Sequence, residues 1–185
     1  DDIYDEFVAE LTKLASGLMP GRPTAMEERQ YAPLSSRTAA ERVDEQVRGA
    51  IAEGATLVVG GQLGEGPAAY YSPSVLTDVT PEMAAYREEI FGPVAIVFRV
   101  NSEDEALRLA NDCAFGLGGS VFSADPARAK RIAAQLEVGM TNVNTIAAEA
   151  AELPFGGAKE SGFGREMGPL GMDEFVNKRL LFVAE

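Results

Sequence analysis

Residues 94–144 decide the fold, and they read VAIVFRVNSEDEALRLANDCAFGLGGSVFSADPARAKRIAAQLEVGMTNVN. Three apolar runs, at 94–100, 118–123 and 138–144, have the composition of buried strands. Two polar segments with apolar residues at helical spacing separate them. Strands that alternate with helices in this way predict an α/β fold with a largely parallel sheet flanked by helices.

Both of these helices carry clear start signals. Ser102 is followed three residues later by Glu105, which is a capping box, and Asp125 is followed by Pro126, which favours the first helical position. The sequence therefore predicts helices that begin just after Ser102 and Asp125.

The first sixty residues continue the pattern. Apolar residues at helical spacing predict a helix over 3–18, and a second helix opens with the capping-box pattern Thr38 to Glu41 and ends at Gly54. A short strand is predicted at 56–59. The apolar face expected on the second helix consists of Val43, Val47, Ala50 and Ile51.

A glycine-rich stretch, GGQLGEGP at 60–67, lacks the Lys-Ser/Thr pair of a phosphate-binding loop, and no helical pattern follows it. It is interpreted as a hairpin-like connection into an extended segment at 70–76. A last strand is predicted at 180–183, where LLFV is apolar.

Composition excludes several classes of function. The 185 residues have 46% hydrophobic content, a net charge of −13, one cysteine and no histidine. The negative charge argues against nucleic-acid and anionic-membrane partners, and no apolar run approaches the length of a membrane span. His-dependent triads and metal sites, an internal disulfide and CxxC sites are excluded for this chain. A cytoplasmic domain without a metal is expected.

Three places could carry chemistry. In the turn at 87–94, a carboxylate could accept hydrogen bonds from a sugar diol beside a phenyl ring; from the residues alone, a solvated acidic turn with a core phenylalanine is favoured. The glycine-rich loop at 153–166 is equally consistent with a structural loop and with a site. Cys113 has no histidine or lysine near it in sequence, so it is expected to be a packing residue.

Five segments resemble signatures of the aldehyde dehydrogenase superfamily, in family order. Two are highly specific: EEIFGPV at 88–94 and PFGGAKESGFGRE at 154–166. The others are ANDCAFGLG at 110–118, GMTNVN at 139–144 and DIYDEF at 2–7. The chain is identified by this resemblance as a member of the superfamily.

The resemblance implies a chemistry and a set of site residues. In the superfamily a cysteine thiolate attacks an aldehyde, hydride passes to the nicotinamide of NAD or NADP, and water releases a carboxylic acid. By resemblance, Glu89 binds the nicotinamide ribose and Phe91 packs beside it. Phe155 resembles an aromatic wall of the substrate tunnel, and Asn144 and Glu149 stand where substrate contacts occur.

The resemblance also implies how the chain relates to the whole enzyme. Residues 1–185 are expected to be the C-terminal part of the catalytic domain, beginning just after the nucleophilic cysteine in its G-Q-x-C setting. The N-terminal cofactor-binding domain and the general base are then absent, no catalytic residue is assigned to this chain, and the chain alone is expected to be inactive. The 180–183 strand is expected to pair across a subunit interface in a homo-oligomer.

Two segments, YAPLSS at 31–36 and ELPFGG at 152–157, are most similar to those of bacterial succinate-semialdehyde dehydrogenases. The resemblance therefore implies a small aldehyde substrate, with succinate semialdehyde as the candidate. The alternative function is a non-catalytic binding or assembly module that kept the fold. A G-Q-x-C segment encoded upstream would favour the enzyme.

Overall fold

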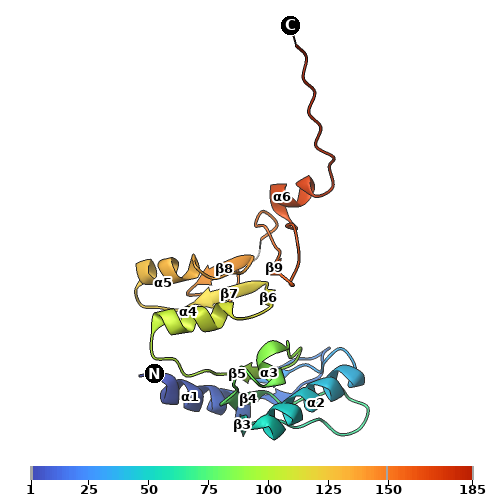
Figure 1. Cartoon of the computed structure of the whole chain (residues 1–185). Helices are drawn as coiled ribbons and strands as arrows, with labels where there is room; N and C mark the ends of the chain where they lie inside the picture. The colour runs from blue at the N-terminus through green and yellow to red at the C-terminus, as the bar shows by residue number, and fades with distance from the viewer. Residues whose placement is uncertain (1, 149, 185) are drawn as a thin grey trace. The chain divides into compact units, whose positions relative to one another are not determined.

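The computed structural model describes residues 2–148 and 150–184. The chain divides into two compact units, residues 1–100 and 101–185, each with its own strands and helices (Figure 1).

The first unit holds the elements α1 (Tyr4–Ser16), β1 (Met19–Pro20), β2 (Gln30–Tyr31), α2 (Arg37–Glu53), β3 (Thr56–Val59), β4 (Ser74–Thr77), α3 (Ala84–Arg87) and β5 (Val94–Ile96). The second unit holds α4 (Glu103–Asn111), β6 (Phe115–Gly116), β7 (Gly118–Val121), α5 (Pro126–Ala133), β8 (Met140–Val143), β9 (Ala158–Lys159) and α6 (Gly168–Asp173).

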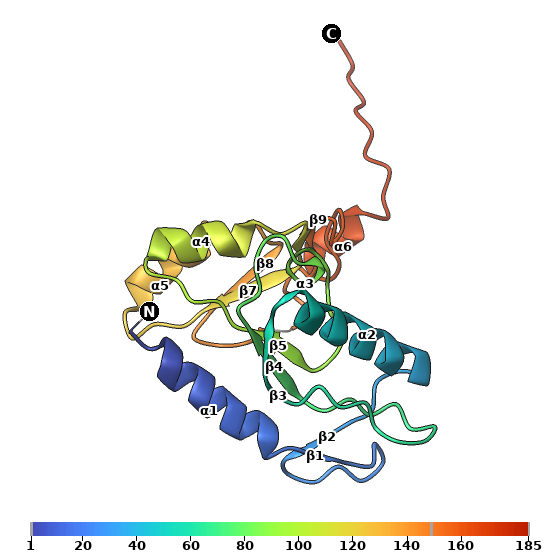
Figure 2. The ribbon, with the colours of Figure 1, turned by 60° about the horizontal axis from the view of Figure 1, so that its bottom comes forward.

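A three-stranded sheet in the order β3-β4-β5 forms the centre of the first unit. β4 runs antiparallel to β3 and parallel to β5, and all four of its residues are buried. Figure 2 shows α1 and α2 on either side of these strands. Because side chains of a strand alternate between the two faces of a sheet, burial of every residue in β4 requires cover on both faces.

The apolar face of α2 supplies the main core. Val43, Val47 and Ala50 are buried, and they cluster with Leu76 of β4 and with Tyr71. Burial and the nearby Asp44 carboxylate raise the pKa of Tyr71 to about 12. The expected face of α2 is confirmed at these three positions.

The same helix differs from the sequence prediction at two points. Ile51, predicted on the apolar face, is exposed to 40% because it lies one position beyond the buried stripe. The cap is Ser36, whose hydroxyl accepts a hydrogen bond from the Ala39 amide at 3.1 Å, so the capping box predicted at Thr38 is wrong. Gly54 ends the helix with a φ of 116°, as predicted.

The glycine-rich stretch forms the predicted hairpin connection. Leu63 and Tyr71 form an antiparallel bridge between its arms. The Arg37 guanidinium donates from Nη1 to the carbonyls of Gly64 and Gly66, at 2.6 and 2.9 Å. A side chain from the first turn of α2 therefore binds two carbonyls of this connection.

In the second unit, β7 and β8 are parallel, and α5 packs on both. The caps predicted at Ser102 and Asp125 are confirmed: Ser102 accepts from the Glu105 amide, and Asp125 accepts from the amides of Ala127 and Arg128. Parallel pairing in both units bears out the predicted α/β class, with antiparallel pairs β3-β4 and β6-β9 added.

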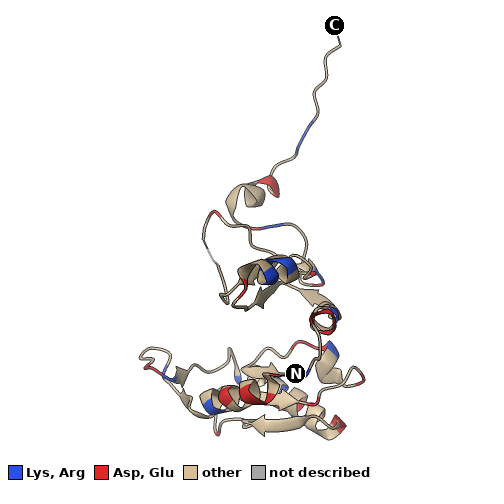
Figure 3. Cartoon of the chain, turned by 90° about the vertical axis from the view of Figure 1, so that its left-hand side faces the viewer, with Lys and Arg blue, Asp and Glu red and all other residues tan. Residues whose placement is uncertain are grey.

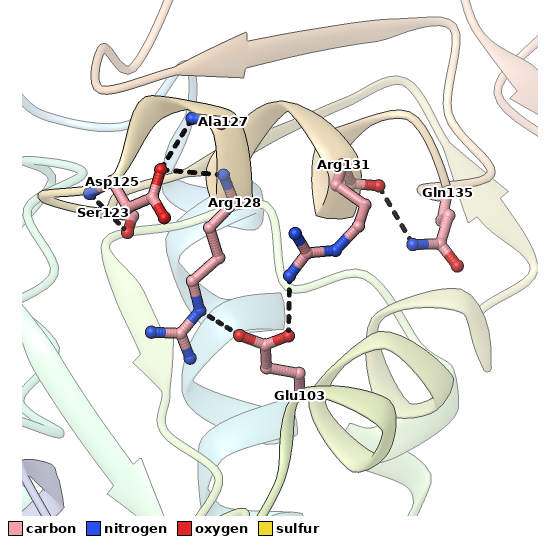
Figure 4. Close-up of polar contacts among 7 residues, drawn as sticks. All are labelled: Glu103, Ser123, Asp125, Ala127, Arg128, Arg131 and Gln135. Carbon is pink, nitrogen blue, oxygen red and sulfur yellow. Dashed lines mark hydrogen bonds and ion pairs between the residues drawn. The ribbon is translucent and has the colours of Figure 1, made fainter.

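An ion-pair cluster links α4 to α5 (Figure 4). Glu103, in the first turn of α4, receives hydrogen bonds from Arg128 and from Arg131, the second at 3.5 Å. The Arg128 hydrogen bond is the largest cause that lowers the pKa of Glu103. Because these side chains are partly exposed, the cluster orients the two helices more than it stabilises the unit.

The strand predicted at 180–183 is not formed: these residues have no regular secondary structure, and their side chains are 76–89% exposed. A terminal segment forms strand structure only where a partner edge completes its hydrogen bonds. The predicted pairing with another subunit thus stays a prediction.

Figure 3 shows acidic and basic residues in both units, and the 29 acidic against 16 basic residues of the sequence give the net charge of −13. Among the residues described, no helix combines the length and apolarity needed to cross a membrane. Over the same part of the chain, no cluster of three His, Cys, Asp or Glu residues could hold a metal ion.

The cap of α2 provides a direct test of the fold. Ser36→Ala should lower the free energy of unfolding by about 1 kcal/mol, because the first-turn amide loses its acceptor. The matched variant Thr38→Ala should change it by less than about 0.5 kcal/mol. Urea unfolding followed by circular dichroism measures both; a larger loss from Thr38→Ala would restore the capping box at that residue.

Candidate functional site

An amide side chain of α2 binds the turn after α3. Gln46 donates from Nε2 to the Glu88 carboxylate at 3.0 Å and to the Glu89 carbonyl at 3.2 Å. At Gly92 a Cβ atom would lie 2.7 Å from Cγ2 of Val43, so only glycine lets the turn approach the helix this closely. These contacts fix the distance between the turn and α2.

Both predicted cofactor residues project from this turn. Glu89 is exposed and Phe91 is exposed to 78%, so the interpretation of Phe91 as a core residue is wrong. A ring that is left in solvent beside a carboxylate can pack on a flat group, while the carboxylate accepts two hydrogen bonds from a diol.

The two side chains border a hollow of about 260 Å³ whose other wall is α2. Three polar residues of that wall, Thr38, Arg42 and Gln46, were missed at the level of sequence. Their spacing of four places them on one face of the helix, which is the signal that could have found them. Arg42 brings a positive charge to a site that already has a carboxylate and an aromatic ring.

In the second unit the loop at 153–166 closes on itself. The Phe155 amide donates to the Glu166 carbonyl at 2.9 Å, and the Glu166 amide donates back to the Phe155 carbonyl at 2.6 Å. The Arg165 guanidinium donates to the carbonyls of Gly157 and Gly164, at 2.8 and 2.6 Å. The loop is therefore a fixed structure although little of it is helix or strand.

Phe155 is half-buried and lines a hollow of about 290 Å³. The other residues around the hollow are mostly apolar and come from β8, the segment before the loop, the two ends of the loop and the residue after it: Met140, Ala148, Ala150, Leu153, Pro154, Glu166 and Met167. Such a lining suits the carbon chain of a small molecule. The loop that sequence reasoning left open between a structural and a site role thus forms one wall of a hollow.

Of the two remaining predicted residues, Asn144 and Glu149, the structure describes Asn144. Asn144 has a positive φ of 57°, and its amide is occupied: Oδ1 accepts from the Ser123 amide at 2.8 Å and Nδ2 donates to the Ser123 carbonyl at 3.0 Å. These bonds hold the end of β8, and a substrate contact by Asn144 stays a prediction. Glu149 lies outside the described residues.

Cys113 is exposed, so its interpretation as a packing residue is wrong. It follows the end of α4, and its sulfur accepts a hydrogen bond from the Phe115 amide at 3.4 Å. Lys159, which is far from Cys113 in the sequence, donates to the carbonyl of Cys113 at 3.0 Å.

Comparison with known proteins fits this geometry. The model of the aldehyde dehydrogenase family matches residues 1–181. The chain belongs to the aldehyde dehydrogenase family. The resemblance inferred from its sequence motifs is thereby confirmed.

Relatives in the family agree over nearly all of the chain. A succinate-semialdehyde dehydrogenase [NADP(+)] of Deinococcus radiodurans is 54% identical over 181 residues, which are 98% of this chain and 38% of the relative. One from Mycobacterium ulcerans is 41% identical, over 98% of this chain and 40% of the relative. The chain thus spans about 40% of the length of these family members.

Solved structures of family members share the fold. The succinic semialdehyde dehydrogenase of Streptococcus pyogenes in complex with NADP+ has a TM-score of 0.93 and 40% identity, covering 100% of this chain and 40% of that one. An aldehyde dehydrogenase of Mycobacterium tuberculosis complexed with NAD+ has a TM-score of 0.86 and 37% identity, covering 94% of this chain and 36% of that one.

The hollow beside Phe155 depends on a close backbone contact that can be tested. A Cβ atom at Gly139, just before β8, would lie 1.8 Å from the carbonyl oxygen of Gly156. Gly139→Ala should lower the free energy of unfolding by about 3 kcal/mol, because two stretches of backbone would have to separate.

Gly118, which pairs with the neighbouring Met140 in the parallel ladder, provides the control. Its Cβ would have 3.7 Å to the nearest atom, so Gly118→Ala should change stability by less than about 1 kcal/mol. Equal effects of the two substitutions in urea unfolding would contradict the close contact.

Proposed function

We propose that this chain supplies the nicotinamide-ribose contacts and part of the aldehyde-binding walls of an NAD(P)-dependent aldehyde dehydrogenase. The observation that carries the proposal is the pairing of Glu89 with Phe91 at the hollow beside α2, in a chain that matches the family over 1–181. A carboxylate and an exposed ring at one turn fit a ribose and a planar base.

Each residue then has a defined role. Glu89 accepts hydrogen bonds from the two ribose hydroxyls, and Phe91 packs against the ribose and the adjoining ring. Arg42, on the opposite wall, is placed to attract the negatively charged part of the same cofactor. When bound, the nicotinamide provides the acceptor for hydride from the substrate.

The reaction proposed is oxidation of an aldehyde to a carboxylic acid through a cysteine thioester, with succinate semialdehyde as the substrate. The names of the relatives from Deinococcus radiodurans and Mycobacterium ulcerans support that substrate. The apolar hollow beside Phe155 suits its carbon chain. Cys113 lies at the exposed end of α4 and is not assigned as the nucleophile, so residues 1–185 alone are proposed to be inactive.

We also propose that the protein works as a cytoplasmic homo-oligomer in which residues 180–183 pair with another subunit. Four consecutive apolar side chains in this segment are 76–89% exposed, and backbone in an extended apolar segment needs a partner strand. The subunit edge that receives the segment completes hydrogen bonds that the chain alone leaves to water.

A kinetic comparison tests the function. A polypeptide that joins this chain to the rest of an aldehyde dehydrogenase should reduce NAD or NADP in the presence of succinate semialdehyde. In that polypeptide, Glu89→Gln should raise the cofactor KM or slow hydride transfer by about tenfold, since neutral acceptors form weaker hydrogen bonds with the ribose.

The control is Glu88→Gln, whose side chain can keep its hydrogen bond to Gln46. It should leave the cofactor KM within about twofold of the wild type. Equal kinetics for the wild type and Glu89→Gln would remove Glu89 from the cofactor site. Failure of the wild type to oxidise any aldehyde would favour the non-catalytic binding module.

The oligomer is tested by a charge in the terminal segment. Leu181→Asp should shift the sedimentation coefficient at micromolar concentration towards that of the monomer, because a buried carboxylate is costly at an interface. Ala184→Ser, next to the apolar run, should leave the assembly unchanged. A wild-type protein that sediments as a monomer would refute the proposal.

A further inference from the structure

One ammonium group joins three segments of the second unit. Lys159 Nζ donates to the carbonyl of Asn111 at 2.7 Å and to that of Cys113 at 3.0 Å, and it forms an ion pair with the Glu137 carboxylate at 3.0 Å. An ammonium has three donors, and here each has an acceptor. The side chain of Lys159 is only 24% exposed, so these acceptors replace most of its water.

The surroundings favour a positive charge at this point. Asn111 is the last residue of α4, where the helix dipole places partial negative charge on free carbonyls. The Asn111 side chain also binds the turn before β8, with Nδ2 donating to Gln135 and Oδ1 accepting from Glu137. Lys159 therefore binds Asn111, the residue whose side chain already joins α4 to the turn before β8.

The backbone at Lys159 shows that its side chain is directed there at a cost. Lys159 has a φ of 54°, a conformation that side-chain-bearing residues adopt rarely. Adjacent bonds fix the same turn: the Glu160 amide donates to Ala114, and Ser161 Oγ accepts from the Gly116 amide. The contacts of one lysine with three acceptors offset the strain of that conformation.

The anchored turn belongs to the loop that carries Phe155. β9 pairs with β6 at Lys159 and Phe115, and the loop returns to the Phe155–Glu166 bridge from there. Gly156, next to Phe155, lies directly against Gly139 at the start of β8. A shift of β9 away from α4 would therefore move Phe155 relative to Met140 on the other wall of the hollow.

We propose that Lys159 is a positioning residue for the aldehyde site: it holds the 153–166 loop on the end of α4 and thereby fixes Phe155 at the wall of the hollow. The effect on substrate rests on the proposed function, whereas the anchoring of the loop does not. Lys159 touches no substrate in this role; it acts through Phe155.

The experiment compares Lys159→Met with Lys130→Met in the polypeptide that is used for the kinetic assay. Met keeps an unbranched side chain, one heavy atom shorter than Lys, and removes the charge and donors. Lys130 lies on α5 and is exposed, which makes it the matched control. Lys159→Arg, which retains charge and donors, is the conservative variant.

Two readouts are measured. Lys159→Met should raise the KM for the aldehyde by about tenfold, with the cofactor KM within about twofold of the wild type. Hydrogen exchange of the Phe155 and Glu166 amides should be about tenfold faster, with α5 amides unchanged. Lys159→Arg should recover most of both effects, and Lys130→Met should show neither.

The outcomes separate this inference from the proposed function. Unchanged exchange at Phe155 and Glu166 in Lys159→Met overturns the anchoring role. Faster exchange with an unchanged aldehyde KM overturns the positioning of the substrate wall. If the wild type oxidises no aldehyde but the exchange effect is present, the anchoring of the loop is supported and the proposed function is not.

Discussion

Buried or ordered backbone must find hydrogen-bond partners, and both candidate sites lie on segments that have little helix or strand to provide them. Long polar side chains supply donors instead, from the neighbouring helix α2 at the first site and from the loop itself at the second. Gln46 reaches the carbonyl of Glu89, Arg165 reaches two glycine carbonyls, and Lys159 reaches the end of α4. Without these donors the loops would exchange their protein contacts for water and lose a defined shape.

This arrangement explains why glycine is so common at the sites. A loop that is held by side-chain donors must come close to the element that provides them, and a Cβ atom then has no room. Gly92 lies against Val43, and Gly139 lies against the carbonyl of Gly156. At the turn after α3 the two features act together: Gly92 lets the turn approach α2, and Gln46 of the same helix fixes the distance between them.

The sequence was most informative where local physics decides the outcome. Caps at Ser102 and Asp125 follow from interactions within a few residues and were predictable, and helical spacing identified three of the four positions expected on the buried face of α2. Thr38 was mistaken for a cap because Ser36, two residues earlier, also has a hydroxyl. The exposure of Cys113 and the role of Lys159 depend on contacts between residues far apart in sequence, which no local pattern encodes.

Some site residues were predictable from the sequence and others were not. Family motifs pointed to Glu89, Phe91 and Phe155 because those motifs are rigid in spacing. Arg42 and Gln46 were missed because a polar helix face ordinarily faces solvent, and only the position of the turn over α2 makes it a wall. The strand expected at 180–183 could not be judged locally, since a strand exists only with its partner.

Cys113 is the only cysteine in the sequence, and it is exposed. A thiol-reactive fluorophore or spin label would therefore attach at one known position without any substitution. That position is two residues beyond the end of α4, on backbone whose carbonyl receives a hydrogen bond from Lys159. Residues 1–185 thus carry a natural attachment point for a reporter of the contact between Lys159 and the end of α4.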